Sequence, residues 1–337
     1  MRLNTERTVF HIMKRYQSIG ESEMDLHNCT LCPRNCHADR INGQTGYCGQ
    51  TNQIRAARAA LHMWEEPCIS GQTGSGTVFF SGCNMGCIFC QNHTISQGMA
   101  GKEISVERLT QIFLELQSQH ACNINLVTPT HFIPQIKKAL EDAKAGGLSI
   151  PVVYNTSSYE KADMLKELDG LIDIYLPDLK YFSPVLSKKY SFAEDYFMHA
   201  SSAIHEMVRQ TGTPVFAPQP LTGSIDEKDD YSGPLMKKGV IVRHLLLPGC
   251  IEDSRQVLQY LYRTYKNDIY VSIMNQYTPI LSAQDAQTCP ELNRPVTSRE
   301  YDKLTDYALH IGIENGFIQD GGTCLESFIP PFDCSGI

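Results

Sequence analysis

The stretch TVFFSGCNMGCIFCQN, residues 77–92, joins a short apolar run to three cysteines with the spacing C-x3-C-x2-C: Cys83, Cys87 and Cys90. A short apolar run of this kind is typical of a strand that is buried on both faces. Zinc and cubane clusters usually have four protein ligands. Three thiolates therefore indicate either a four-iron cluster with one open iron or a zinc site completed by a distant Cys or His.

Five further apolar runs follow, and helical patterns separate them. Six strands that alternate with helices predict an α/β fold with a parallel sheet, and right-handed connections curl such a sheet into an open or closed barrel. The six predicted strands are residues 77–82, 123–128, 151–155, 173–176, 240–247 and 269–274.

Three regions follow from this pattern. Residues 1–75 are predicted to form an N-terminal helix, over about the first 20 residues, and a Cys-rich metal-binding segment. Residues 76–280 form the partial (β/α)6 TIM-like barrel, and residues 281–337 a C-terminal extension with one good helix.

Composition narrows the class of protein. Hydrophobic residues make up 42% of the 337 residues and charged ones 20%, as in a folded protein with a sizeable core. A net charge of −8 without a basic run argues against nucleic-acid binding, and no apolar run is long enough to cross a membrane. Thirteen cysteines without a secretory signal predict a reducing, cytoplasmic location.

Eight of the thirteen cysteines lie between residues 29 and 90, which favours metal ligation over disulfides. Cys29, Cys32, Cys36 and Cys48 can complete a four-thiolate site, and nearby Pro and Gly residues provide the sharp turns. Zinc and an iron–sulfur cluster both fit this spacing. Unligated buried thiols are the alternative.

Polar residues follow several of the predicted strands, at the edge where ligands of parallel α/β folds gather. Asn155 is a candidate cofactor contact or a helix cap, and Asp178 and Lys180 could bind a substrate or pair with each other. Arg243 and His244 are neighbours in one strand, so only one of them should point inward, and an inward Arg would suit a carboxylate. His244 could equally be a core histidine. The remaining candidates are Thr128, Thr130, His131, His62, Glu65 and Glu66.

The three-cysteine motif, with Phe89 before its last cysteine, resembles the signature of the radical SAM superfamily. This resemblance implies a 4Fe-4S cluster on Cys83, Cys87 and Cys90 whose fourth iron binds S-adenosylmethionine. It also implies an oxidoreductase that cleaves this cofactor to a 5′-deoxyadenosyl radical for hydrogen abstraction, with a flavodoxin- or ferredoxin-like electron donor. Many members end the second strand with Gly-Gly-Glu, which this chain lacks. Its cofactor contacts are therefore expected from Phe89, Thr128, Thr130, Asn155 and Arg243.

Segments along most of the chain resemble the pyruvate formate-lyase activating enzyme-like group. They are residues 26–36, 65–71, 74–92, 123–136, 173–181 and 240–249. This resemblance implies a glycyl-radical enzyme as partner. Modification of a peptide or small molecule is the alternative, and a non-catalytic iron–sulfur or zinc carrier is a third possibility. Glycyl-radical activases often carry extra cysteines after the cluster motif, whereas here they precede it.

Overall fold

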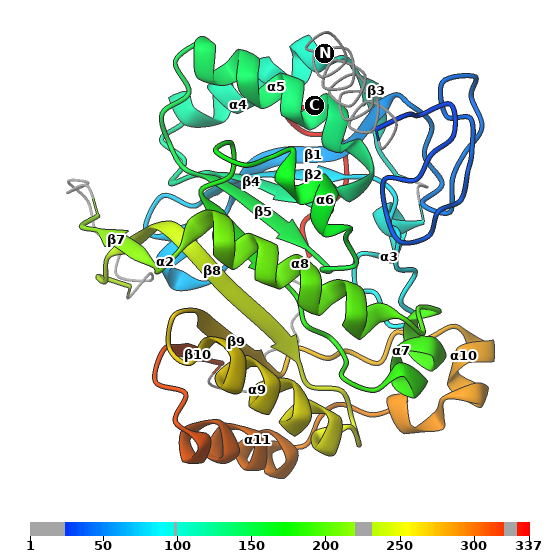
Figure 1. The fold of residues 1–337 in the computed structure, drawn as a ribbon, viewed down its shortest axis with the longest axis vertical. Helices are drawn as coiled ribbons and strands as arrows, with labels where there is room; N and C mark the ends of the chain where they lie inside the picture. The colour runs from blue at the N-terminus through cyan, green and yellow to red at the C-terminus, as the bar shows by residue number, and fades with distance from the viewer. Residues whose placement is uncertain (1–23, 98–99, 220–230, 320–328) are drawn as a thin grey trace, which may run out of the picture.

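The computed structural model describes residues 24–97, 100–219, 231–319 and 329–337 (Figure 1). The predicted N-terminal helix lies outside these residues.

All six predicted strands form, within two residues of the expected positions except for an earlier start in the fifth. They are β2 (Ser75–Phe80), β4 (Ile124–Val127), β5 (Val152–Thr156), β6 (Ile174–Pro177), β8 (Leu235–Leu245) and β9 (Tyr270–Met274). They pair in parallel in this order, and β10 (Gly316–Ile318) continues the parallel sheet beyond β9. Residues of β4, β5 and β6 are all buried, which explains their mainly apolar sequences.

Besides β10, three strands of the described residues had no counterpart in the sequence prediction. β1 (Ile54–His62) pairs antiparallel with β2, β3 (Lys102–Ile104) pairs antiparallel with β1, and β7 (Val215–Ala217) with β8. The N-terminal region over residues 1–75, in which the sequence predicted no strand, therefore contains β1. Its sequence, IRAARAALH, is rich in Ala and Arg, which have little strand propensity, so tertiary pairing decides its conformation.

Helices cover the sheet between the strands (Figure 1). The longer ones are α4 (Val106–Ser118), α5 (Ile133–Ala145), α7 (Pro184–Ser191), α8 (Tyr196–Thr211), α9 (Ile251–Tyr265) and α11 (Ser298–Ile311). Ser105 caps α4, because its side chain accepts a hydrogen bond from the Arg108 amide. Short helices are α2 (Pro67–Ser70), α3 (His93–Ser96), α6 (Ala162–Lys166) and α10 (Ala283–Thr288), with 3-10 turns at Thr130–Phe132 and Pro290–Leu292.

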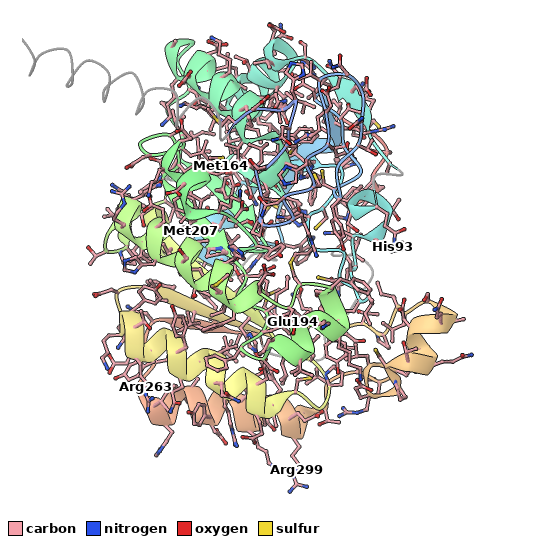
Figure 2. The ribbon with its side chains drawn as sticks, turned by 45° about the vertical axis from the view of Figure 1, so that its right-hand side comes forward. His93, Met164, Glu194, Met207, Arg263 and Arg299 are labelled. Carbon is pink, nitrogen blue, oxygen red and sulfur yellow. The ribbon has the colours of Figure 1, made fainter. Side chains whose placement is uncertain are left out.

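The predicted C-terminal extension has its one good helix in α11, which packs against α9. Figure 2 shows side chains filling the space between the helices and the sheet, while Arg299 at the start of α11 extends away from the body. No helix in the described part of the chain is both long and apolar enough to span a bilayer.

Candidate active site

The sheet curls around a cavity of about 600 Å³. Residues from seven of its strands line this cavity, which is the arrangement expected of a partial barrel. They are His62, Phe79, Val127, Asn155, Arg243, Ser272 and Phe317, on β1, β2, β4, β5, β8, β9 and β10 respectively.

The loop that follows β2 brings the motif cysteines to this cavity. Cys87, Phe89 and Cys90 line it, and Cys83 is half-buried in the same loop (residues 83–90, here the cluster loop). Burial raises the pKa of Cys87 to about 12, and nearby Lys180 partly opposes this. The thiol therefore stays protonated near neutral pH unless a metal binds it.

The cluster loop offers hydrogen-bond donors to its own sulfurs. The Met85 amide donates to Cys83 Sγ at 3.4 Å, and the Ser191 hydroxyl donates to Cys87 Sγ at 3.0 Å. Gly86 has φ +74°, and a Cβ there would lie 3.0 Å from Tyr47 Oη, so glycine suits the position. Donors to sulfur and a close-fitting backbone are what an iron–sulfur cluster needs, so these residues fit one.

In the described ranges, no three His, Cys, Asp or Glu side chains stand close enough together to hold a single metal ion. A four-iron cluster holds its ligands further apart than a single ion does. The fit of the cluster loop therefore rests on its thiols and their hydrogen-bond donors.

A charged network forms one wall of the cavity. Arg243 donates from Nε to Asp178 Oδ1 at 3.1 Å, from Nη1 to Glu65 Oε2 at 3.2 Å and from Nη2 to Asn155 Oδ1 at 2.5 Å. Lys180 pairs with Asp178 at 2.6 Å, so the structure shows the ion pair that the sequence left open. Burial alone would raise the pKa of Asp178, but Lys180 and Arg243 together lower it.

Glu66 adds a carboxylate to this wall. The residue is 8% exposed and lines the cavity, and among the described residues its Oε2 has no hydrogen-bond partner. Burial raises the pKa of Glu66, although Arg243 nearby opposes this. A buried carboxylate oxygen without a partner favours a ligand that carries a hydrogen-bond donor or a positive charge.

The predicted cofactor contacts divide into two groups. Phe89, Asn155 and Arg243 line the cavity, as do the weaker candidates His62 and Glu65. Thr128 and Thr130 are not among the lining residues, and Thr130 instead donates to the buried carboxylate of Glu160 at 2.6 Å.

The two other predicted histidines lie in the core. His244 is on the opposite face of β8 from Arg243, as strand alternation requires, and its Nδ1 lies 2.7 Å from the Leu179 carbonyl. His131 Nε2 lies 2.7 Å from the Ser81 carbonyl, just before the cluster loop. Burial lowers the pKa of His131 to about 3 and that of His244 to about 4, so both are neutral. The structure thus places both away from the cavity.

The four N-terminal cysteines lie in a Cys-rich segment (residues 29–48) at the edge of the fold beside β3 and α3 (Figure 1). A Cβ at Gly46 would lie 2.8 Å from Cys36 Sγ and 3.7 Å from Cys48 Sγ, so these two thiols pack closely against the glycine. Burial raises the pKa of Cys32 to about 12, and the neighbouring Cys48 and Cys29 raise it further. Cys36 and Cys48 therefore lie on the same side of Gly46, and Cys29 and Cys48 lie near enough to Cys32 to affect its pKa.

Two functional neighbours of the cluster loop were not predicted from the sequence. Arg34 and Tyr47, both in the Cys-rich segment, contact the backbone of the cluster loop. The only signal was an arginine between two candidate ligands, Cys32 and Cys36, and nothing local shows which way its side chain extends.

Comparison with known proteins agrees with this site. Residues 77–214 match the family model of the radical SAM superfamily. The uncharacterized protein MJ0674 of Methanocaldococcus jannaschii is 26% identical over 291 residues, which are 83% of this chain and 74% of that protein.

Similar solved structures include SuiB of Streptococcus suis bound to S-adenosylmethionine (12% identity, TM-score 0.46, 74% of this chain). Another is the FeFe-hydrogenase maturase HydG of Carboxydothermus hydrogenoformans (12% identity, TM-score 0.41, 74% of this chain). The chain spans only 50% of the SuiB chain and 58% of the HydG chain.

Proposed function

We propose that this protein is a radical SAM enzyme that reductively cleaves S-adenosylmethionine and abstracts a hydrogen atom from a substrate held in the cavity. The observation that carries the proposal is that Cys87 and Cys90 of the family motif line the same cavity as Glu66, Asn155 and Arg243. When bound, the cluster and cofactor would supply the electron transfer and the radical; the protein would supply position and exclude water.

The chain's own residues have separate tasks in this proposal. Cys83, Cys87 and Cys90 hold the cluster. The cofactor has an ammonium, a sulfonium and a carboxylate, and the cavity wall presents both carboxylate and guanidinium groups. Every nitrogen of Arg243 already donates to the protein, so we expect Arg243 chiefly to hold Asn155 and Asp178 in place.

Anaerobic reconstitution with iron and sulfide, followed by reduction and an assay for 5′-deoxyadenosine, tests the proposal. Formation of 5′-deoxyadenosine and methionine is expected. A fully loaded, reduced cluster that leaves S-adenosylmethionine intact would refute it and favour a non-catalytic metal carrier.

There are two candidate substrates. Sequence resemblance supports the first, and the size of the cavity supports the second. Resemblance to pyruvate formate-lyase activating enzymes favours a glycyl-radical enzyme as partner, whereas a cavity of about 600 Å³ also suits a peptide side chain or a small molecule. A glycyl-radical signal in electron paramagnetic resonance, formed on a partner enzyme, would favour the first. We further propose a flavodoxin- or ferredoxin-like electron donor and a cytoplasmic location.

We also propose that Cys29, Cys32, Cys36 and Cys48 hold a second metal centre, either zinc or iron–sulfur. Arg40 supports this proposal. Its side chain is 1% exposed, its Nη1 lies 3.7 Å from Cys29 Sγ, and no carboxylate of the described residues lies within ion-pair distance. A buried guanidinium needs a counter-charge, and four metal-bound thiolates carry a net negative charge that would provide it.

A further inference from the structure

Arg34 connects the Cys-rich segment to the cluster loop. Its Nε donates to the Asn84 carbonyl at 2.7 Å and its Nη2 to the Met85 carbonyl at 2.9 Å. The guanidinium lies 3.9 Å from the centre of the Tyr47 ring, a cation–π distance, and Tyr47 Oη donates to the same Met85 carbonyl at 3.3 Å. Two side chains of the Cys-rich segment therefore hold the backbone between Cys83 and Cys87.

One of these contacts involves the peptide unit that faces a cluster ligand. The carbonyl of Asn84 and the amide of Met85 belong to the same planar trans peptide, so they point in opposite directions. The carbonyl accepts from Arg34, and the amide donates to Cys83 Sγ at 3.4 Å. By fixing the carbonyl outward, Arg34 fixes the N–H toward the sulfur.

The second sulfur has a donor in a similar position. The Ser191 hydroxyl donates to Cys87 Sγ at 3.0 Å, and the Ser191 carbonyl accepts from Arg34 Nη2 at 3.2 Å. Arg34 Nη1 also donates to the carbonyl of the next residue, Phe192, at 2.5 Å. One guanidinium thus holds both segments that present a hydrogen-bond donor to a motif cysteine.

We propose that Arg34 is a positioning residue that aims the Met85 amide and the Ser191 hydroxyl at the sulfurs of Cys83 and Cys87, and so raises the reduction potential of the bound cluster. This inference rests on the proposed function, because it requires a cluster on those cysteines. Hydrogen bonds to ligand sulfurs withdraw negative charge and make a cluster easier to reduce. A donated bond at the carbonyl also polarises the peptide and strengthens its N–H as a donor.

Redox titration of the reconstituted full-length protein, followed by electron paramagnetic resonance, tests the inference. In Arg34→Gln the midpoint potential is expected to shift to more negative values, because the two donors lose their orientation. Arg34→Lys keeps the charge but cannot bond two segments with a planar fork, so a smaller shift is expected. Arg108→Gln is the matched control. Arg108 also donates to a backbone carbonyl, that of Gly336 at 3.1 Å, but from the outer helix α4, so no shift is expected.

A second variant keeps the test decisive if Arg34→Gln fails to fold or to retain iron. Ser191→Ala removes one donor to Cys87 without touching the Cys-rich segment, and a smaller negative shift is expected. An unchanged potential in fully loaded Arg34→Gln, or in Ser191→Ala where the first variant cannot be loaded, overturns the inference. Failure of the proposed function is distinct: it would show as intact S-adenosylmethionine with the wild-type protein, and the potentials could still be compared.

Discussion

The two groups of cysteines use the same donor atom in different surroundings. In the cluster loop, Cys87 and Cys90 face a cavity, and Lys180 lies near enough to lower the pKa of both thiols against the effect of burial. In the Cys-rich segment, the Cys36 and Cys48 thiols lie beside Gly46 and the Cys29 thiol lies beside the buried Arg40, and none of the four thiols lines the cavity.

The two groups of cysteines therefore differ in whether a ligand can reach a metal that they bind. Under the proposed assignments, three thiols leave one metal position open for a ligand in the cavity, whereas four thiols fill every position of a tetrahedral metal. The two groups also touch, because a Cβ on Gly82, next to Cys83, would lie 2.5 Å from the Cys48 carbonyl. We therefore expect changes in the cluster loop to remove chemistry and changes in the Cys-rich segment to remove stability first.

The largest effect is expected from replacing Cys83, Cys87 and Cys90 together by Ala. Formation of 5′-deoxyadenosine should fall to background, because no ligand for the catalytic cluster remains, while iron or zinc in the Cys-rich segment should persist. Metal analysis and product chromatography measure both. Cys122→Ala is the control, since that thiol donates to the Ser70 carbonyl, outside the cluster loop. Cleavage that survives in the triple variant would contradict the assignment of the cluster.

A Cys29→Ala, Cys32→Ala double variant is expected to lose the second metal and several kcal/mol of stability, because a structural metal contributes on the order of 10 kcal/mol to such small motifs. Loss of zinc alone would identify a zinc site, and loss of iron with sulfide an auxiliary cluster. Metal content identical to the wild type would rule out a second metal on these cysteines.

Arg40→Met tests the charge of the same centre. If metal-bound thiolates balance Arg40, its removal should lower the unfolding free energy by about 3–5 kcal/mol, because a buried negative charge is left without its partner. If the thiols are neutral, the loss should be smaller, because only the hydrogen bonds from Arg40 to the Thr51 carbonyl, at 3.1 and 2.6 Å, are removed. Urea unfolding with and without chelator measures this change in unfolding free energy. Arg40→Lys, which keeps the positive charge, is the comparison variant.

The smallest effect is expected at Glu160. The preceding residue, Tyr159, contacts the cluster loop, because its carbonyl accepts a hydrogen bond from the Asn84 side chain. Burial raises the pKa of Glu160 from 4.5 to about 7. A folded-state pKa above the unfolded value means that its contribution to stability is fully present below pH 4.5 and is lost as the pH rises through 7.

Relative to Glu160→Gln, the wild type should therefore lose about 3 kcal/mol of unfolding free energy as the pH rises from 4.5 to above 7. Urea titrations of both proteins across this range measure the difference. A constant difference across the range would show that the carboxyl is not protonated in the folded protein.

Much of the fold followed from local sequence. The mainly apolar runs over residues 123–128, 151–155 and 173–176 predicted β4, β5 and β6, because strands covered on both faces favour apolar residues on both faces. β1 could not be predicted, since its Ala and Arg residues adopt a strand only by pairing with β2.

Some features of the candidate site could likewise be predicted from the sequence, and others could not. Alternation along a strand predicted that only one of Arg243 and His244 would face inward, and the structure shows that it is Arg243. The positions of Glu66 and Thr130 depend on how distant segments meet, so spacing along the chain did not reveal them.

By itself, the sequence determined the motif cysteines, the parallel strand order and the end of the sheet at which the cluster loop lies, because spacing and apolar runs are local properties. Only the tertiary structure decided that the Cys-rich segment packs on the cluster loop. The reason is physical: Arg34 meets the carbonyls of Asn84, Met85, Ser191 and Phe192, and the last two lie more than 150 residues away along the chain. Contacts of that range leave no periodic trace in a sequence, yet here they orient the donors that face the cysteines of the motif.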